Sequence, residues 1–109
     1  MPKTLTSEEC KALTQKLIHA YELMRTKNIF QPKQLVRWKK GLKNKGLPEY
    51  DEPAIVWEIL TVPRFDEAEA HGAGSPYFHE PLDIVLAMLD EDDDFVLFHY
   101  DSRRFEPFP

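Results

Sequence analysis

Five consecutive acidic residues are the strongest chemical feature of this sequence, because they concentrate negative charge between two apolar runs. The runs are Leu82–Leu89 and Phe95–Tyr100, and the acids between them are Asp90, Glu91, Asp92, Asp93 and Asp94. A tight cluster of carboxylates steers cationic partners through its electric field. We therefore expect residues 90–94 to form an acidic patch that binds a protein with a basic surface.

The acidic tract also resembles part of a calcium-binding loop. Asp90, Asp92 and Asp94 hold the first, third and fifth positions of such a loop, and Asp101 falls at the twelfth. The sixth position requires glycine but holds Phe95, and the flanking runs are typical of strands rather than helices. We therefore predict no metal site here and interpret the tract as a solvated hairpin loop.

A basic cluster in the first half of the chain points to a second function. Lys33, Arg37, Lys40 and Lys43 are spaced to share one face of a helix, with Trp38 between them. On such a face the cations could contact phosphates while the indole stacks on a base. Nucleic-acid binding is therefore the alternative function, and a solvated helix face with a core tryptophan is the other interpretation.

No set of residues predicts catalysis or a cofactor. Cys10 lies on the apolar stripe of a predicted helix, which is typical of a small core residue. His71, His79 and His99 follow no recognised ligand spacing, although a ligand or metal at the loop that holds the first two stays open. Residues 72–75 match neither a nucleophile elbow nor a phosphate loop. We therefore expect a non-enzymatic protein without a cofactor.

The net charge of -5 conceals an uneven distribution along the chain. Residues 1–47 carry eleven lysines and arginines against three glutamates, whereas residues 48–109 carry three arginines against sixteen acids. Either the two halves bind oppositely charged partners, or they fold against each other and neutralise. Arg103 and Arg104 are expected to pair with acids of their own half.

Length and composition place the chain among small globular proteins. Its 109 residues predict a single domain, 1–109, and 42% hydrophobic residues suffice for a modest core. The single cysteine is typical of a reducing compartment, so we expect a cytoplasmic protein. No apolar run approaches the roughly 20 residues of a membrane span, so no membrane association is expected.

The N-terminal residues predict a long helix, Ser7–Lys27. Thr6 is a suitable N-cap, and Glu9 three residues later completes a capping box. Apolar residues then recur at the spacing of one buried helix face, at Cys10, Leu13, Leu17, Tyr21 and Met24.

A second helix is expected over residues 32–45. Pro32 suits the first helical position, and Gly46 suits the position just past the end. Leu35, Trp38 and Leu42 form an apolar stripe along it. This helix would carry the basic cluster.

The run Ala54–Val62 is ambiguous between helix and strand. We favour a strand slightly, because five of its nine residues are β-branched and a lone hairpin needs a third strand. The two apolar runs around the acidic tract form that hairpin. The expected fold is therefore α+β, with an N-terminal pair of helices packed on a small antiparallel sheet that ends in a C-terminal β-hairpin.

The leading functional hypothesis is a small cytosolic interaction module that binds a basic partner through residues 90–94. A regulatory protein, such as an immunity or inhibitor protein for a nucleic-acid-acting enzyme, fits this charge layout. The alternative is nucleic-acid binding through the basic second helix. Neither hypothesis identifies the partner or the oligomeric state.

Overall fold

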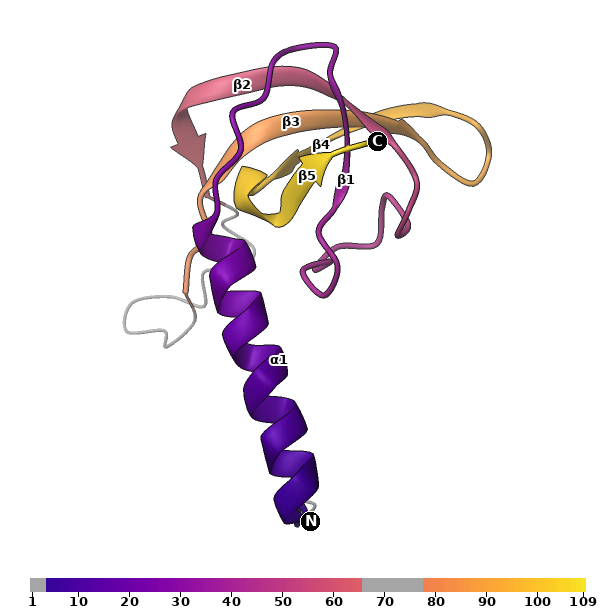
Figure 1. Cartoon of the computed structure of the whole chain (residues 1–109). Helices are drawn as coiled ribbons and strands as arrows, with labels where there is room; N and C mark the ends of the chain where they lie inside the picture. Colours follow the sequence, from indigo (N-terminus) through magenta and orange to yellow (C-terminus); the bar gives the residue numbers. More distant parts are fainter. Residues whose placement is uncertain (1–3, 66–77) are drawn as a thin grey trace.

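The computed structural model describes residues 4–65 and 78–109, which form one α-helix and an antiparallel sheet of five strands (Figure 1). The strands lie in the order β4-β3-β2-β1-β5. The elements, in chain order, are α1 (Ser7–Arg25), β1 (Leu35–Trp38), β2 (Ala54–Arg64), β3 (Leu82–Leu89), β4 (Phe95–Tyr100), one turn of 3-10 helix η2 (Ser102–Arg104) and β5 (Phe105–Pro107).

The hairpin of β3 and β4 confirms the strand bounds predicted from the two apolar runs. Its register pairs Leu89 with Phe95 at the turn and Ile84 with Tyr100 at the open end. The ambiguous run from Ala54 onward is also a strand, and it pairs with β3 on the other side. The third strand that the hairpin needs is therefore β2.

The hydrophobic core lies on the inner face of the sheet. Val36, Val56, Ile84, Leu86 and Met88 point into it from three neighbouring strands, and each is at most 6% exposed. Three aromatic residues complete it: the rings of Trp38 and Phe105 stack with their centroids 4.2 Å apart, and Tyr100 packs edge-on against both.

The connection between β1 and β2 closes over this core. The indole N–H of Trp38 donates to the Pro48 carbonyl at 2.6 Å, and the Tyr100 hydroxyl donates to the Leu47 carbonyl at 2.7 Å. Leu42, from the same connection, is also buried. A loop and the C-terminal segment therefore cover the inner face, where a helical pair was expected.

The prediction of a second helix over residues 32–45 is wrong, and so is the predicted fold, in which an N-terminal pair of helices packs on a small antiparallel sheet. Residues 35–38 form β1, which pairs with β2 on one side and β5 on the other. Lys33 and Gly41, on either side of the strand, have positive φ angles of 78° and 87°, which end regular structure there. Burial alternates along β1, with Val36 and Trp38 inward. Tertiary pairing has overridden the helical spacing of the apolar residues.

Helix α1 starts as predicted but is not packed on the sheet. The Thr6 side chain accepts from the Glu9 N–H, and the Glu9 carboxylate accepts from the Thr6 N–H, both at 3.1 Å. The predicted buried stripe is nevertheless exposed, because no residue of α1 is buried. Figure 1 shows the helix extending away from the sheet, which it meets at its C-terminal end. No helix in the described part of the chain has the length and apolar content needed to cross a bilayer.

Candidate interaction surfaces

The acidic turn, residues 90–94, connects β3 to β4 and is ordered by its own first residue. The Asp90 carboxylate accepts from the N–H groups of Asp92 and Asp94 at 2.9 and 3.0 Å. The Asp90 N–H donates to the Asp94 carbonyl at 2.9 Å, which closes the loop. Asp93 takes the left-handed conformation, with φ at 61°, that aspartate tolerates better than most residues. The turn therefore has a defined backbone.

The acidic turn presents four of its five side chains to solvent. Glu91, Asp92, Asp93 and Asp94 are exposed, and no described lysine or arginine forms an ion pair with them. Carboxylate oxygens of Asp90, Asp92 and Asp94 lie within 4.8 Å of one another. One oxygen of Asp90 is already used by the backbone, and calcium takes six to eight oxygens. The geometry therefore favours a concentrated negative surface over a built cation site.

The basic residues predicted to bind nucleic acid are not brought together on one helix face. Trp38 is buried and stacked on Phe105, so its indole is not available to a base. Arg37 lies on β1, where its Nε donates to Glu106 at 2.8 Å. The rest of the set lies in the turns around β1, with Lys33 and Lys40 exposed and Lys43 half-buried.

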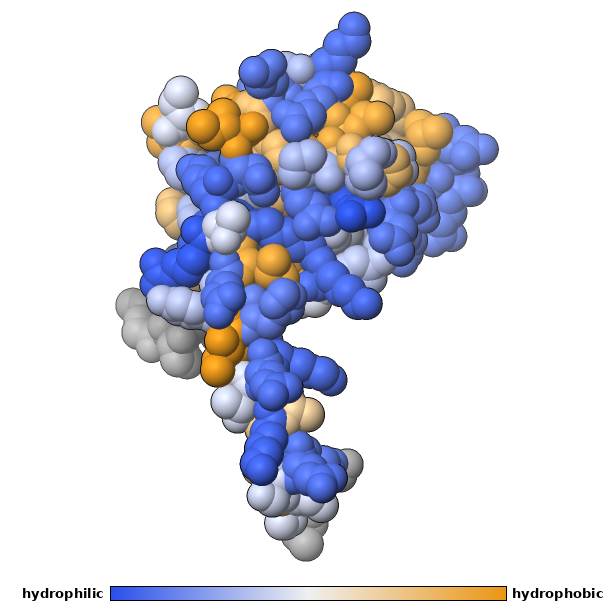
Figure 2. Space-filling view, viewed as in Figure 1, coloured by the Kyte–Doolittle hydropathy of each residue, from blue (hydrophilic) through white to orange (hydrophobic). Residues whose placement is uncertain are grey.

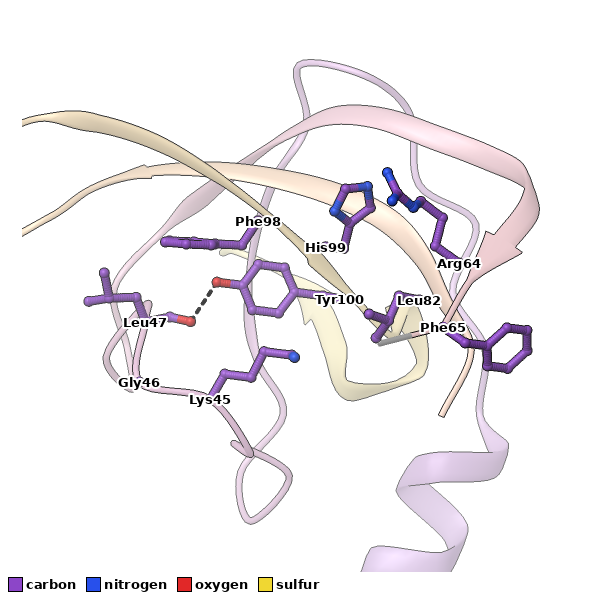
Figure 3. Close-up of a pocket in the computed structure, with 9 residues that line it drawn as sticks. All are labelled: Lys45, Gly46, Leu47, Arg64, Phe65, Leu82, Phe98, His99 and Tyr100. Atoms are coloured by element: carbon purple, nitrogen blue, oxygen red, sulfur yellow. Dashed lines mark hydrogen bonds between the residues drawn. The ribbon is translucent and has the colours of Figure 1, made fainter. Parts of the chain in front are cut away.

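A groove of about 750 Å³ lies beside β4 and combines cations with aromatic rings. Figure 3 shows the Tyr100 ring near its centre, with Lys45 below it and Arg64 and His99 above. Phe98, which is 44% exposed, also lines the groove, and Figure 3 shows it beside Tyr100 on the side away from Arg64. The sequence did not predict this groove, because its residues come from β2, β3, β4 and the connection after β1, and only the fold brings them together.

The outer face of the sheet was also missed. On this face a row of apolar residues crosses four strands in direct register, from Leu35 through Ile55 and Ala87 to Leu97. We define the outer face by this row together with its neighbours Trp57, Leu89 and Phe95. The rings of Trp57 and Phe95 meet at 6.2 Å, and each residue is 56% exposed. The signal was present in β3, whose continuous apolar run is typical of a strand covered on both faces.

Buried charges join α1 and the C-terminal segment to the sheet. The Lys39 ammonium donates to the carbonyls of Leu23 and Thr26, each at 2.5 Å, at the C-terminal end of α1. Burial lowers the pKa of Lys39, an effect that the nearby carboxylates of Glu106 and Asp101 partly offset. The positive charge nevertheless lies where a helix end presents unpaired carbonyls.

The expected pairing of Arg103 and Arg104 with acids of their own half is confirmed. Arg103 binds Asp101 through two nitrogens, at 3.0 and 2.6 Å, and this hydrogen-bonded carboxylate raises the pKa of the Arg103 guanidinium. Arg104 binds Glu80 at 2.6 Å. These two arginines therefore hold the end of the chain in place and are not available to a ligand.

The histidines do not form a described cluster. His99 lies on the same face of β4 as Phe95 and Leu97, as strand alternation predicts. His79 is exposed, whereas His71 and the glycine-rich residues 72–75 lie outside the described residues.

Comparison of the chain with protein families, curated proteins and solved structures found no match.

Proposed function

We propose that this chain is a non-enzymatic protein-interaction module that uses the acidic turn to bind a partner with a basic surface. The observation that carries the proposal is that the carboxylates of residues 90–94 are largely exposed and form no described ion pair. Four of the five residues are exposed, and no described cation neutralises any of the five. A cytosolic setting fits the single free cysteine.

The turn presents its charge in a form suited to recognition. Hydrogen bonds from the backbone to Asp90 order the loop before any partner arrives, which lowers the entropy lost on binding. The hairpin carries the charge at its tip, away from the paired charges of Lys39 and Arg103. A cluster of this kind raises the rate of encounter with a cationic surface and makes binding sensitive to salt.

The chemistry of the turn indicates the class of partner. Closely spaced carboxylates present a dense negative charge, as a nucleic-acid backbone does, so surfaces that bind nucleic acid through lysine and arginine are suitable targets. A regulator that masks such a surface, in the manner of an immunity or inhibitor protein, needs no catalytic residue of its own.

The test uses a fluorescent peptide of about 20 residues rich in lysine and arginine, followed by anisotropy at low and physiological salt. The triple variant Asp92→Asn, Asp93→Asn, Asp94→Asn removes three charges from the turn and should weaken binding about tenfold. The matched control Glu49→Gln, Glu52→Gln, Glu58→Gln removes three exposed charges elsewhere, none of them in a described ion pair, and should leave the affinity nearly unchanged. Equal losses in the two variants would show that only net charge matters and would contradict the proposal.

The groove supports a second candidate function, which is the binding of single-stranded nucleic acid. Lys45, Arg64 and His99 line it with Phe98, and no described acid forms an ion pair with the first two. Cations that follow a phosphate backbone beside an exposed ring are the usual elements of such a site. A salt-sensitive gel shift with a single-stranded oligonucleotide, lost in Phe98→Ala, tests this candidate. The absence of any shift at low salt would exclude it.

A further inference from the structure

Strand β4 forms one edge of the sheet and is open to another strand. It pairs with β3 on one side, and no described strand lies on its other side. Its six residues include no proline, lysine or arginine, and Phe95, Leu97 and Phe98 are 56%, 40% and 44% exposed. A regular, apolar edge of this kind is a ready template for pairing with an extended chain.

The opposite edge of the sheet is protected against such pairing. It is formed by β5, which has only three residues and ends in Pro107, a residue that donates no backbone hydrogen bond. Glu106, in the middle of β5, pairs with Arg37 of the neighbouring strand. Short strands, prolines and charges are the usual means by which proteins block a sheet edge. Of the two described edges, therefore, β4 is the one that can accept a strand.

The register of the hairpin shows which backbone groups of β4 are unpaired. Opposite residues of an antiparallel pair alternate between those that exchange hydrogen bonds and those whose N–H and C=O groups point away from each other. The Asp90 N–H donates to the Asp94 carbonyl at the turn, so the second kind comprises Phe95, Leu97 and His99. Their N–H and C=O groups point to the free edge, where no described group bonds them. These three residues offer an extended chain a row of donors and acceptors.

The acidic turn lies at one end of this edge and indicates the charge of the chain that pairs with it. Asp94 directly precedes β4, and Glu91, Asp92 and Asp93 are also exposed. An added strand lies about 4.8 Å from its neighbour, so a lysine or arginine at the corresponding end reaches these carboxylates. Figure 2 shows hydrophilic side chains where β3 turns into β4, next to hydrophobic ones over the sheet. The edge therefore suits an extended segment with one basic end.

Both faces of β4 offer contacts to the side chains of an added strand, which alternate between the two faces. Leu97 is exposed on the outer face. Phe98 and Tyr100 line the groove on the other face (Figure 3). In recognition by strand addition, backbone hydrogen bonds supply affinity and pockets for alternate side chains supply specificity.

We propose that the partner binds through an extended segment that adds to the free edge of β4 as a sixth strand, with its lysines or arginines against the acidic turn. This inference rests on the proposed function, because it names the part of the basic partner that the acidic turn recognises. The segment runs antiparallel to β4, as every described pair of strands does, so its basic residues lie at its C-terminal end.

The first test follows amide hydrogen exchange by NMR, with and without a saturating peptide. The peptide has about ten residues, in which alternating valine and threonine precede a lysine-rich C-terminal end. Exchange at Phe95, Leu97 and His99 should slow about tenfold or more, whereas Val96 and Phe98, already bonded to β3, should change much less. Binding without this alternating pattern would overturn the proposal. Protection of the three amides that grows with protein concentration in the absence of peptide would overturn it too, because a second copy would then occupy the edge.

The second test removes a single backbone donor from the edge. Leu97→Pro deletes an outward N–H without breaking a hydrogen bond to β3, and it should weaken peptide binding about tenfold. Leu97→Thr is the matched control, because threonine keeps the N–H and suits a strand, and its affinity should change by less than about threefold. Circular dichroism checks that both variants are folded. Equal losses in the two variants would show that the side chain matters and the backbone does not, which contradicts strand addition.

A modified peptide makes the same test on the unaltered protein. Methylation of its valine and threonine nitrogens keeps every charge and side chain but removes the backbone donors. The methylated peptide should bind about tenfold more weakly, with no protection of the β4 amides. Equal affinities of the two peptides would overturn the proposal.

Strand addition can fail separately from the proposed function. The triple asparagine variant of residues 92–94 should weaken binding of the strand-forming peptide and also of a lysine–glycine peptide of equal charge. If it weakens both and neither peptide protects the β4 amides, the acidic turn is the site and strand addition is wrong. If the strand-forming peptide binds and protects these amides equally well in the triple variant, the edge selects no basic partner and the proposed function is wrong.

Discussion

At the scale of single residues, Lys39 is the most informative side chain. It is 2% exposed, and burial lowers its pKa, yet its ammonium meets two carbonyls at the C-terminal end of α1. Nothing in the sequence distinguishes it from Lys40 beside it, because both belong to a run of lysines that resembled a solvated helix face. Alternation along β1 places Trp38 inward and would place the next residue, Lys39, outward; Lys39 is buried instead because its ammonium binds the C-terminal end of α1.

Replacement of Lys39 by methionine should lower the free energy of unfolding by about 2 kcal/mol, because two helix-end carbonyls lose a charged donor. Urea unfolding at neutral pH measures this change. Lys40→Met, at the exposed neighbouring position, is the control and should change stability by less than about 0.5 kcal/mol. Equal effects at the two positions would show that Lys39 does not anchor the helix.

Tyr100 provides a second test at this scale, which is the change in the free energy of unfolding at alkaline pH. Burial raises the pKa of its phenol, so the folded state keeps a proton that the unfolded state loses above about pH 10. The free energy of unfolding should therefore fall as the pH rises above 10, by at most about 1.4 kcal/mol per pH unit. Tyr100→Phe should be less stable at pH 8, because its hydrogen bond to Leu47 is lost, but should show a smaller alkaline decline. Parallel pH profiles for the two proteins would contradict this account.

At the scale of elements, the hairpin and the start of α1 were predictable because their signals are local. The acids between two apolar runs mark a turn, and Thr6 with Glu9 marks a helix start. The segment 32–46 was not predictable, because its apolar residues fit both a helical spacing and the alternation of β1. Pairing with β2 and β5, which are distant in sequence, decides between them.

The exposure of α1 predicts that its cap controls helix content and has little effect on the sheet. Thr6→Ala should weaken the helix by about 1 kcal/mol and reduce the circular dichroism signal at 222 nm. Thr14→Ala, in the middle of the helix, should increase that signal, because alanine has the higher helix propensity. Cooperative urea unfolding of the sheet, followed by the fluorescence of Trp38 and Trp57, should change little in either variant. A large loss of sheet stability in Thr6→Ala would mean that α1 packs more closely on the body than described.

At the scale of the whole molecule, the uneven charge of the sequence is only partly neutralised by folding. Arg37 pairs with Glu106 at 2.8 Å and lies 3.9 Å from Asp51, and Lys27 lies 3.9 Å from Asp83, so cations of the first half do meet acids of the second. The acidic turn takes no part in the described pairs. The predicted acidic patch therefore keeps the separate outward surface on which its proposed role depends.

The candidate surfaces differ in how far the sequence could reveal them. The acidic turn is contiguous, so its residues were identified with their bounds. The basic set assumed a helix, and the buried Trp38 removed its base-stacking residue. The groove and the outer face are assembled from strands that are far apart in the chain. The continuous apolar run of β3 indicates two apolar faces, but it does not identify the strands that extend them.

The most direct test of the proposed function is to map the site of a basic peptide on the folded protein by NMR. Titration with the lysine- and arginine-rich peptide should shift the backbone amides of residues 90–94 most strongly, and the shifts should diminish as salt is added. Shifts concentrated around Lys45 and Arg64, or spread evenly over all exposed acids, would contradict the assignment of the acidic turn as the binding surface.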